Sequence, residues 1–345
     1  MSDKKHTVFV LAIDGEPLTP TTPAKARKLL KGSVAKPAWS KFGTFGIQML
    51  VETRREIPDT SLGVDNGTKF EGYAVVCGQE NNLSVKLDLP DKKKIVRKLD
   101  ERRRLRRARR QRKCRRRPAK FNNRKRDGFL APSQAVIVGS RLKVMRELFR
   151  MYPIQYVGFE DVRFNHARHR WGANFSTVEI GKQRLRDFFD SQGAEVFDYR
   201  GWETKTLREY YGYHKSSDKS ADVFTAHCSD ALALACDVGP EVRVKPSLFL
   251  VVDDTYRPVR RRLHDTQFAK GGVRDKYSQG TVFGLQKGLL IGTSTGHTGR
   301  LCGEIRSGAY RYYDEEGKRR QSKSLDWIST QFVIRKETGA HSPPP

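Results

Sequence analysis

The sequence predicts an α/β protein with a central mixed β-sheet, and two observations carry this prediction. Three short strand-like segments follow one another between residues 59 and 91, and helices then alternate with strands up to residue 238. That order is typical of a layered α/β core. Residues 1–58 form a small module before the core, and residues 239–345, rich in glycine and short strand candidates, predict a β-rich C-terminal domain.

The N-terminal module begins with an apolar segment, residues 7–13, which predicts a strand. A short basic helix follows from Ala24 to Lys31, because Thr22 is a good N-cap, Pro23 suits the first helical position and Gly32 ends the pattern. Phe45 to Glu52 predicts a second strand. We therefore expect a compact unit of residues 1–58.

The core segments are assigned from alternation and from turn signals. Asp65-Asn-Gly67 ends the first strand of a three-strand meander that continues to residue 91. Beyond the basic segment, helices and strands are expected in turn at Ala131–Tyr152, Ile154–Glu160, Thr177–Gln192, Ala194–Tyr199 and Asp222–Asp237. This gives a core made of residues 59–91 and 128–238.

Composition excludes several classes of protein. The 345 residues contain 67 Lys+Arg against 39 Asp+Glu, a net charge of +28, but 37% are hydrophobic, which excludes a disordered polycation. No apolar run is long enough to span a membrane. The five cysteines form no C-x-x-C pair, so we expect a reducing, cytoplasmic compartment and no zinc ribbon. The charge indicates a polyanionic partner.

Most of this charge lies in one segment. Residues 92–126 contain 21 Lys+Arg against two acids, a net charge of +19 that leaves +9 for the other 310 residues. The stretch from Lys93 to Arg117 has no Gly or Pro and consists mostly of good helix formers. We favour a long basic helix, ordered by itself or on nucleic acid, over a floppy linker.

Three acids and one histidine follow the core elements in a pattern that suits phosphodiester cleavage. Asp65 and Glu160 end two strands, Asp230 begins the Ala-rich helix, and His227 precedes Asp230 by one helical turn. Converging carboxylates can hold one or two divalent metals, and a neutral histidine can accept a proton. Singly, each acid is explained as well by a turn, a strand end or a helix start; the order and spacing of the set favour a nuclease site.

Several motifs resemble those of a known family. Gly63-Val-Asp65-Asn-Gly67 through Gly72, Tyr156-Val-Gly-Phe-Glu160, and Ala226-His227-Cys-Ser-Asp230 resemble the three motifs of a RuvC-like nuclease domain of the RNase H fold. The arginine-rich segment resembles the bridge helix of RNA-guided nucleases. Pro17-Leu-Thr-Pro20 resembles, with one departure, the PLMP module of the transposon-encoded IscB family. The resemblance covers nearly the whole chain.

The length of one interval identifies the branch of the family. IscB proteins carry an HNH nuclease between the second and third motifs, but here Glu160 and His227 are only 67 positions apart. His166, His169 and Asn174 contain the residue types of an HNH site, but the ββα-metal framework of such a site is lacking. The chain therefore resembles IsrB, the HNH-less relative, rather than TnpB, which usually carries a zinc ribbon.

The resemblance implies an RNA-guided nickase. Such proteins bind a guide RNA (the ωRNA), recognise a short motif beside the target and nick the non-target strand of double-stranded DNA. Asp65, Glu160 and Asp230 would ligate two Mg²⁺ ions, with Mn²⁺ as a substitute and no zinc, and His227 would assist the nucleophile. Asp161 adjoins Glu160, but neighbours on a strand face opposite ways, so we choose Glu160. We expect a monomeric ribonucleoprotein, with no membrane partner, in the prokaryotic cytoplasm and on the nucleoid when it binds DNA.

Nucleic-acid contacts are expected from two basic regions, the bridge helix of residues 92–127 and the domain of residues 239–345. The candidates are Arg102, Arg103, Arg104, Arg106, Arg107, Arg109, Arg110, Arg112, Lys113, Arg115, Arg116, Arg117, Arg260, Arg261, Arg262, Lys270 and Arg274. Two alternatives remain. The chain is a non-catalytic RNA-binding protein whose acids are structural, or a structure-specific Holliday-junction resolvase, for which the flanking modules are superfluous.

Overall fold

The fold is described from a computed structural model that contains two compact units. One comprises Met1–Ala38, Phe45–Asp254 and Ile334–Pro345, and the other Trp39–Thr44 and Thr255–Val333. The residues described are 7–113, 130–163, 179, 181–254, 266–267, 272–273, 281–283, 285–287, 289–305, 307–314, 316–329 and 332–339.

The N-terminal module is a four-stranded sheet with one helix. Its strands are β1 (Val8–Leu11), β2 (Pro17–Thr21), β3 (Ala35–Trp39) and β4 (Phe45–Met49), in the order β2-β1-β4-β3. Helix α1 (Pro23–Lys31) begins where predicted, with the Thr22 hydroxyl accepting from the Lys25 N–H at 3.3 Å. Strands β2 and β3 were not predicted. Both contain proline, which cannot donate to a neighbour, and both lie at the sheet edges where that is tolerated.

The core is a seven-stranded mixed sheet in the order β20-β10-β7-β6-β5-β8-β9. The predicted meander is β5 (Thr60–Asp65), β6 (Phe70–Cys77) and β7 (Glu80–Asp88), all antiparallel, and β8 (Tyr156–Glu160) and β9 (Glu195–Tyr199) continue parallel to β5. Strand β10 (Leu248–Asp254) runs parallel to β7, and β20 (Phe332–Gly339) completes the edge. The mixed α/β fold predicted from the sequence is therefore what the structure has.

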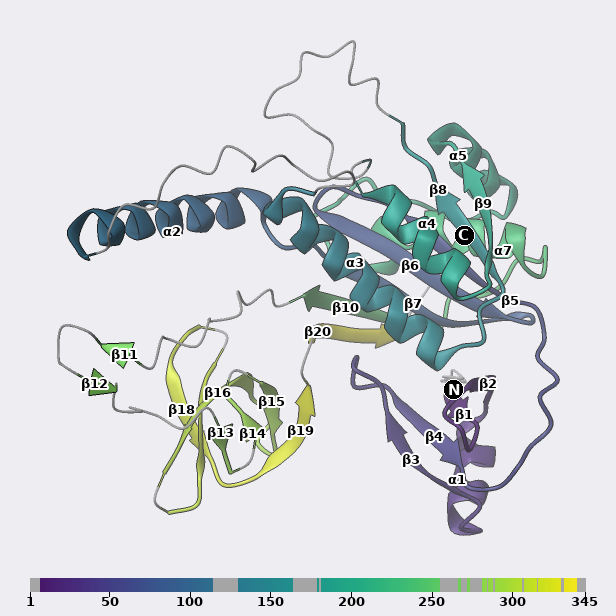
Figure 1. Ribbon diagram of the computed structural model, residues 1–345. Helices are drawn as coiled ribbons and strands as arrows, with labels where there is room; N and C mark the ends of the chain where they lie inside the picture. Colours follow the sequence, from purple (N-terminus) through teal and green to yellow (C-terminus); the bar gives the residue numbers. More distant parts are fainter. Residues whose placement is uncertain are drawn as a thin grey trace. The chain divides into compact units, whose positions relative to one another are not determined.

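Helices cover both faces of this sheet. Helices α3 (Pro132–Met151) and α4 (Lys182–Ser191) lie side by side on one face (Figure 1). Helix α7 (Ser229–Val238) packs against β5, β6 and β8, and α5 (Gly201–Tyr210) packs on α7. Because strand residues alternate between faces, Ala74 and Val76 join the α7 core cluster while Glu71 bonds to Arg141 of α3.

Glycines let α7 approach the sheet closely. A Cβ atom on Gly63 would lie 1.7 Å from the Ala231 carbonyl oxygen, and one on Gly72 would lie 2.0 Å from that of His227. Any side chain there would push the helix away, since real Cβ atoms do not approach so closely. Gly63 therefore sets how near α7 comes to β5, and Gly72 sets how near the end of α6 comes to β6.

The predicted basic helix is α2 (Lys92–Lys113), about 33 Å long over its 22 residues. Among its residues up to Arg107, Ile95 is buried and most others, including all the arginines, are exposed. An apolar stripe is absent from this part of the helix, as the sequence predicted. Helix α2 adjoins α3 (Figure 1).

The second unit is built from β-strands. Its largest sheet has the order β18-β17-β16-β15-β19, from β15 (Leu290–Thr293), β16 (Thr298–Glu304), β17 (Tyr310–Tyr313), β18 (Arg319–Ser322) and β19 (Leu325–Ser329). Two hairpins accompany it: β11 (Thr266–Gln267) with β12 (Gly272–Val273), and β13 (Thr281–Val282) with β14 (Leu285–Gln286). Val282, Ile291, Leu301 and Tyr312 form its core.

The predicted domain boundary at residue 239 needs correction. Strand β10 lies in the core sheet, and so does β20, which the sequence analysis had placed in the C-terminal domain. All seven residues of β10 are apolar or acidic and nearly all are buried, as befits a strand covered on both faces. The main segment of the β-rich unit is therefore Thr255–Val333, to which Trp39–Thr44 is added.

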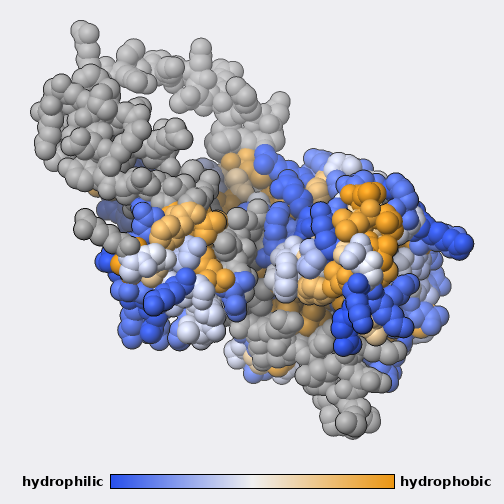
Figure 2. Space-filling model, turned by 90° about the horizontal axis from the view of Figure 1, so that it is seen from below, coloured by the Kyte–Doolittle hydropathy of each residue, from blue (hydrophilic) through white to orange (hydrophobic). Residues whose placement is uncertain are grey.

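The surface is mixed in character. On the face seen in Figure 2, hydrophilic residues surround separate hydrophobic patches. In the described part of the chain, none of the helices combines the length and the apolar character that crossing a bilayer requires.

Candidate active site

Two of the predicted acids meet at the ends of neighbouring parallel strands. Val64 pairs with Phe159, which places Asp65 of β5 beside Glu160 of β8, and the two carboxyls are hydrogen-bonded. Burial, together with repulsion from Asp65, raises the pKa of Glu160 to about 9. Burial and the nearby Asp230 charge also raise the pKa of Asp65. The raised pKa favours a protonated Glu160 at neutral pH.

The turn after Asp65 is held by a buried ion pair. Arg141 of α3 donates from Nε to Glu71 Oε1 at 2.5 Å and from a terminal nitrogen to the Gly67 carbonyl at 3.1 Å. Tyr73 donates to the other Glu71 oxygen at 2.6 Å, and neither charged side chain is exposed. In addition, the Asn66 amide donates to the Glu160 backbone carbonyl at 3.1 Å. These bonds fix the end of β5 relative to α3 and β8.

Asp230 lies in the first turn of α7, where it is bound by two cations. Arg208 of α5 contacts one carboxylate oxygen at 2.6 Å, and Lys215 bonds to the other. Asp230 is close enough to raise the pKa of both Asp65 and Glu160. The third predicted acid therefore belongs to the same electrostatic cluster but is paired with Arg208 and Lys215.

His227 is placed differently from the prediction. Instead of one helix over Asp222–Asp237, the chain forms α6 (Phe224–His227) and α7, with a break at Cys228. Nε2 of the buried imidazole donates to the Ala221 carbonyl at 2.9 Å, and Nδ1 has no partner among the described residues. Burial, followed by the charge of Lys86, lowers the pKa of His227. The ring is therefore neutral near pH 7, with Nδ1 free to accept a proton.

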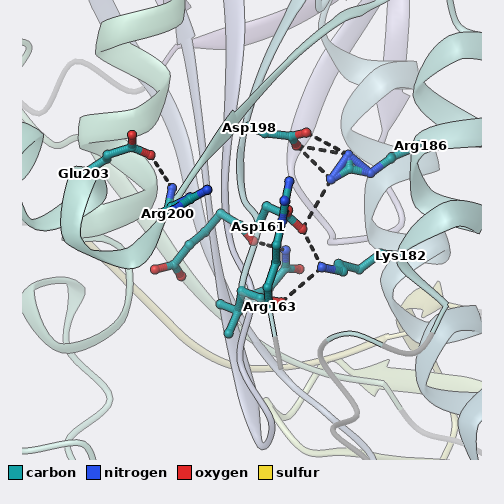
Figure 3. A network of polar contacts seen from close by, with 10 residues as sticks. Asp161, Arg163, Lys182, Arg186, Asp198, Arg200 and Glu203 are labelled. Carbon is teal, nitrogen blue, oxygen red and sulfur yellow. Dashed lines mark hydrogen bonds and ion pairs between the residues drawn. The ribbon is translucent and has the colours of Figure 1, made fainter. Parts of the chain in front are cut away.

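Asp161 lies on the opposite face of the sheet from Glu160. Its carboxylate bonds to Lys182 and Arg163, the latter at 2.6 Å, and Arg186 approaches to 3.3 Å (Figure 3). Burial would raise the pKa of Asp161, but these cations outweigh it and bring the pKa to about 2. Arg186 also bonds to Asp198 of β9 at 2.9 Å. Asp161 therefore joins β8 to α4 and takes no part in the acid cluster.

A cavity of about 630 Å³ opens beside the acids. Asp65 and His227 line it, and so do three lysines, Lys69, Lys215 and Lys219. Phe70 packs edge-on against the His227 ring, with centroids 4.5 Å apart. A carboxylate and a neutral imidazole thus share a pocket whose lining would attract an anionic substrate.

Asp65 and Glu160 fit a divalent cation. Both are oxygen donors, both are half-buried, and a hard cation between them would offset the repulsion that raises the pKa of Glu160. As the side chains stand, however, no three His, Cys, Asp or Glu residues in the described ranges gather into one metal-binding group. Asp230 is the missing member, since Arg208 and Lys215 hold it, and it would join a metal only by exchanging Lys215 for the ion.

The predicted nucleic-acid contacts are described only in part. Arg102, Arg103, Arg104, Arg106 and Arg107 are exposed on α2, and Arg104 also pairs with Asp100 at 3.3 Å. The backbone of Arg109, Arg110, Arg112 and Lys113 is helical, while their side chains lie outside the description. Also outside the described residues are Arg115, Arg116, Arg117, Arg260, Arg261, Arg262, Lys270 and Arg274, together with the HNH-like His166, His169 and Asn174.

The sequence analysis missed Arg208, Lys215 and the Arg141–Glu71 pair. Helix α5, which carries Arg208, had been taken for part of a linking segment, because its apolar residues are few. Lys215 lies between His214 and two serines in a stretch with no periodicity. The one available signal was Arg141, a charged residue on a helix that is otherwise buried on that face, since a buried charge needs a partner.

The structure thus places two carboxyls at the ends of parallel strands, beside a cavity, in a mixed α/β fold. Residues 8–179, a segment that includes Asp65, α2 and Glu160, match the family model described as RRXRR protein.

Two solved structures are similar to part of this chain. "T. thermophilus RuvC in complex with Holliday junction substrate" is 14% identical, with a TM-score of 0.29, over 51% of this chain and 89% of that one. "Thermus thermophilus RuvC structure" is 16% identical, with a TM-score of 0.26, over 51% of this chain and 90% of that one. Among curated proteins, no sequence matches this chain.

Proposed function

We propose that the protein is an RNA-guided DNA endonuclease that nicks the non-target strand in a RuvC-like, Mg²⁺-dependent site. One observation carries the proposal. Asp65 and Glu160, far apart in sequence, lie side by side at the ends of two parallel strands, next to a lysine-lined cavity, and Asp230 and His227 lie near them. Buried carboxyls with raised pKa values beside a cavity are typical of functional sites.

Each residue of the cluster has a defined role in this reaction. Asp65 and Glu160 would hold Mg²⁺, and Asp230 would join them. Bound Mg²⁺ would polarise the scissile phosphate and favour deprotonation of the attacking water. His227 accepts that proton at Nδ1, which is neutral and unpaired among the described residues. Lys69 and Lys219 line the cavity and attract the phosphate backbone, and Lys215 moves from Asp230 toward it.

The RNA guide is supported by the basic helix. Between Arg102 and Arg107, α2 exposes five arginines, and exposed arginines form bidentate contacts with phosphates without reading bases. Together with the motif resemblance, this supports a bound ωRNA that pairs with the target. The active particle is then a monomeric ribonucleoprotein in the cytoplasm, associated with the nucleoid when it is on DNA.

The test begins with purification of the protein from cells and sequencing of any RNA of defined length that accompanies it. The ribonucleoprotein is then incubated with matched duplex DNA and Mg²⁺ or Mn²⁺. We expect one nick, in the strand that does not pair with the RNA. Cleavage by RNA-free protein at the same rate would contradict guidance by RNA.

Asp65→Asn is the decisive variant. We expect it to abolish nicking while RNA binding, measured by filter binding, is unchanged. If wild-type and variant proteins both bind RNA and neither cleaves DNA, the non-catalytic RNA-binding alternative holds. RNA-free cutting of a four-way junction, lost in Asp65→Asn, would instead identify a junction resolvase.

A further inference from the structure

The two most exposed large hydrophobic side chains in the described part of the chain lie on one helix beside the acid cluster. They are Tyr210, 79% exposed, and Trp202, 66% exposed, at the two ends of α5. Single exposed aromatics are ordinary, but two on one ten-residue helix call for an explanation.

The inner side of α5 is anchored, which fixes what the outer side presents. Thr204 is buried, Leu207 packs on the α7 core cluster and Arg208 reaches Asp230. Trp202 and Tyr210 are eight residues apart, two turns of the helix and about 12 Å along its axis, so both lie on the outer face. Thr206 lies between them, and its hydroxyl bonds to the Trp202 carbonyl at 3.1 Å.

The start of this helix touches a catalytic acid. A Cβ atom on Gly201 would lie 3.1 Å from Oε1 of Glu160, so Gly201 lies close to that carboxyl. Trp202 is the next residue in the chain. Arg200, on the other side of Gly201, is exposed, and the Lys205 side chain on the outer face is 66% exposed. Figure 3 shows Arg200 and the capping carboxylate of Glu203 next to the Asp161 network.

We propose that the outer face of α5 binds single-stranded DNA, with one base stacked on Trp202 and another on Tyr210, and guides the strand to Glu160. This rests on the proposed function, because it gives the site its substrate class. Exposed aromatic rings beside cations are what sequence-tolerant binding of single strands requires.

A single strand fits this face better than a duplex or a protein. The faces of paired bases are hidden inside a duplex, while a single strand offers them to an aromatic ring. The separation of about 12 Å equals roughly three to four nucleotides at 3.4 Å each. The exposed Arg200 and Lys205 flank the rings in a chain of net charge +28, which favours a polyanion over a protein partner.

The test measures stacking directly, with no need for cleavage. The full-length protein is titrated in EDTA with a short single-stranded DNA that carries one 2-aminopurine, whose fluorescence falls when the base stacks. We expect the fluorescence change to be lost in Trp202→Ala and the Kd to rise about tenfold, the equivalent of one lost base stack. Trp202→Phe should retain most of both effects, and Tyr210→Ala should give a smaller loss.

Two controls separate stacking from general weakening. Trp39, 63% exposed on β3, is the matched tryptophan, and Trp39→Ala should change nothing. Trp202→Ala should leave the slope of log Kd against log salt unchanged because a ring releases no counterion, whereas Arg200→Gln should reduce it by about 0.7. Unchanged Kd and fluorescence in Trp202→Ala, including the case in which α5 binds a protein instead, overturn the proposal.

The outcome is independent of the proposed nuclease activity. If Asp65→Asn cuts DNA as well as the wild type but Trp202→Ala loses the 2-aminopurine signal, the nuclease site is wrong and the stacking face stands. If Asp65→Asn abolishes nicking and Trp202→Ala binds and nicks normally, with unchanged fluorescence, the reverse holds.

Discussion

Glu160 and Asp161 are neighbours in the chain, and yet their surroundings give them opposite character. Glu160 faces α7 and the acid cluster, where its pKa rises to about 9, while Asp161 faces α4 and three cations, where its pKa falls to about 2. Asp161 is the more buried of the two side chains, so burial alone does not explain the difference. The charge of the partners does: Glu160 lies beside the negative charge of Asp65, whereas Asp161 is surrounded by three cations.

The largest effect is expected when the acid on the cluster side, Glu160, is replaced, and it concerns catalysis. In the metal-free protein Glu160 is protonated at pH 7, and glutamine has the same shape and hydrogen-bonding ability, so Glu160→Gln should keep the melting temperature or raise it. Nicking and the thermal shift caused by Mg²⁺ should both be lost, a loss larger than the 10- to 100-fold typical of residues that only support a ligand. A variant that still melts higher in Mg²⁺ would remove Glu160 from the metal site. Asp198→Asn, in the Asp161 network, is the matched control.

The next largest effect is on stability and concerns another acid, the fully buried Glu71, which forms an ion pair with Arg141. Arg141→Met leaves the Glu71 carboxylate with no cation in a fully buried site and should lower the free energy of unfolding by about 3–5 kcal/mol. The double variant Arg141→Met with Glu71→Gln should recover most of that loss, because no charge is then left behind. Urea denaturation of both variants measures this. Equal destabilisation by the single and double variants would mean that shape rather than charge matters there.

Asp161→Asn should have a moderate effect on stability. It removes the carboxylate from Lys182 and Arg163 and should lower the free energy of unfolding by about 2 kcal/mol, the usual worth of hydrogen bonds to charged groups. The thermal shift by Mg²⁺ should stay, in contrast to Glu160→Gln. Its loss would show that Asp161, and not Glu160, is the ligand.

The smallest effect is on the pH dependence of stability without metal. The folded-state pKa of Glu160 lies above its unfolded value, so its contribution is full below about pH 4 and is lost as pH rises toward 9. The folded-state pKa of Asp161 lies below its unfolded value, so its contribution is present above about pH 4 and is lost as pH falls through about 2. Urea midpoints in EDTA should therefore fall from pH 7 to 9 in the wild type but less in Glu160→Gln. Parallel curves for the two proteins would contradict the raised pKa.

The sequence predicted what local patterns determine. Strands β5 to β9, helices α1, α2 and α3, and the Asp65–Glu160 meeting follow from alternation, capping residues and the rule that parallel strands end at one edge. The opposite orientation of Asp161 was predicted from the same alternation, and its bonds to α4 agree with it.

What could not be predicted depends on contacts between distant residues. Helix α5 has few apolar residues and is recognisable only once α7 is beside it. The break at Cys228 interrupts a continuous helical pattern, because α6 packs on β6 and β7 while α7 follows β5. The sequence places strands β10 and β20 in the C-terminal domain, because both follow residue 239. Only their pairing in the order β20-β10-β7 shows that they belong to the core sheet.

The distance in sequence between the acids has a consequence for synthesis of the protein. Gly63 and Asp65 leave the ribosome long before Ala231, which Gly63 approaches, and Asp230, whose charge acts on Asp65. At roughly 5–20 residues per second, the 165 residues from position 66 to Asp230 take about 8–33 seconds to add. A nascent chain therefore has Asp65 without Asp230 throughout that time. The acid cluster is therefore complete only when translation is well past the midpoint of the chain.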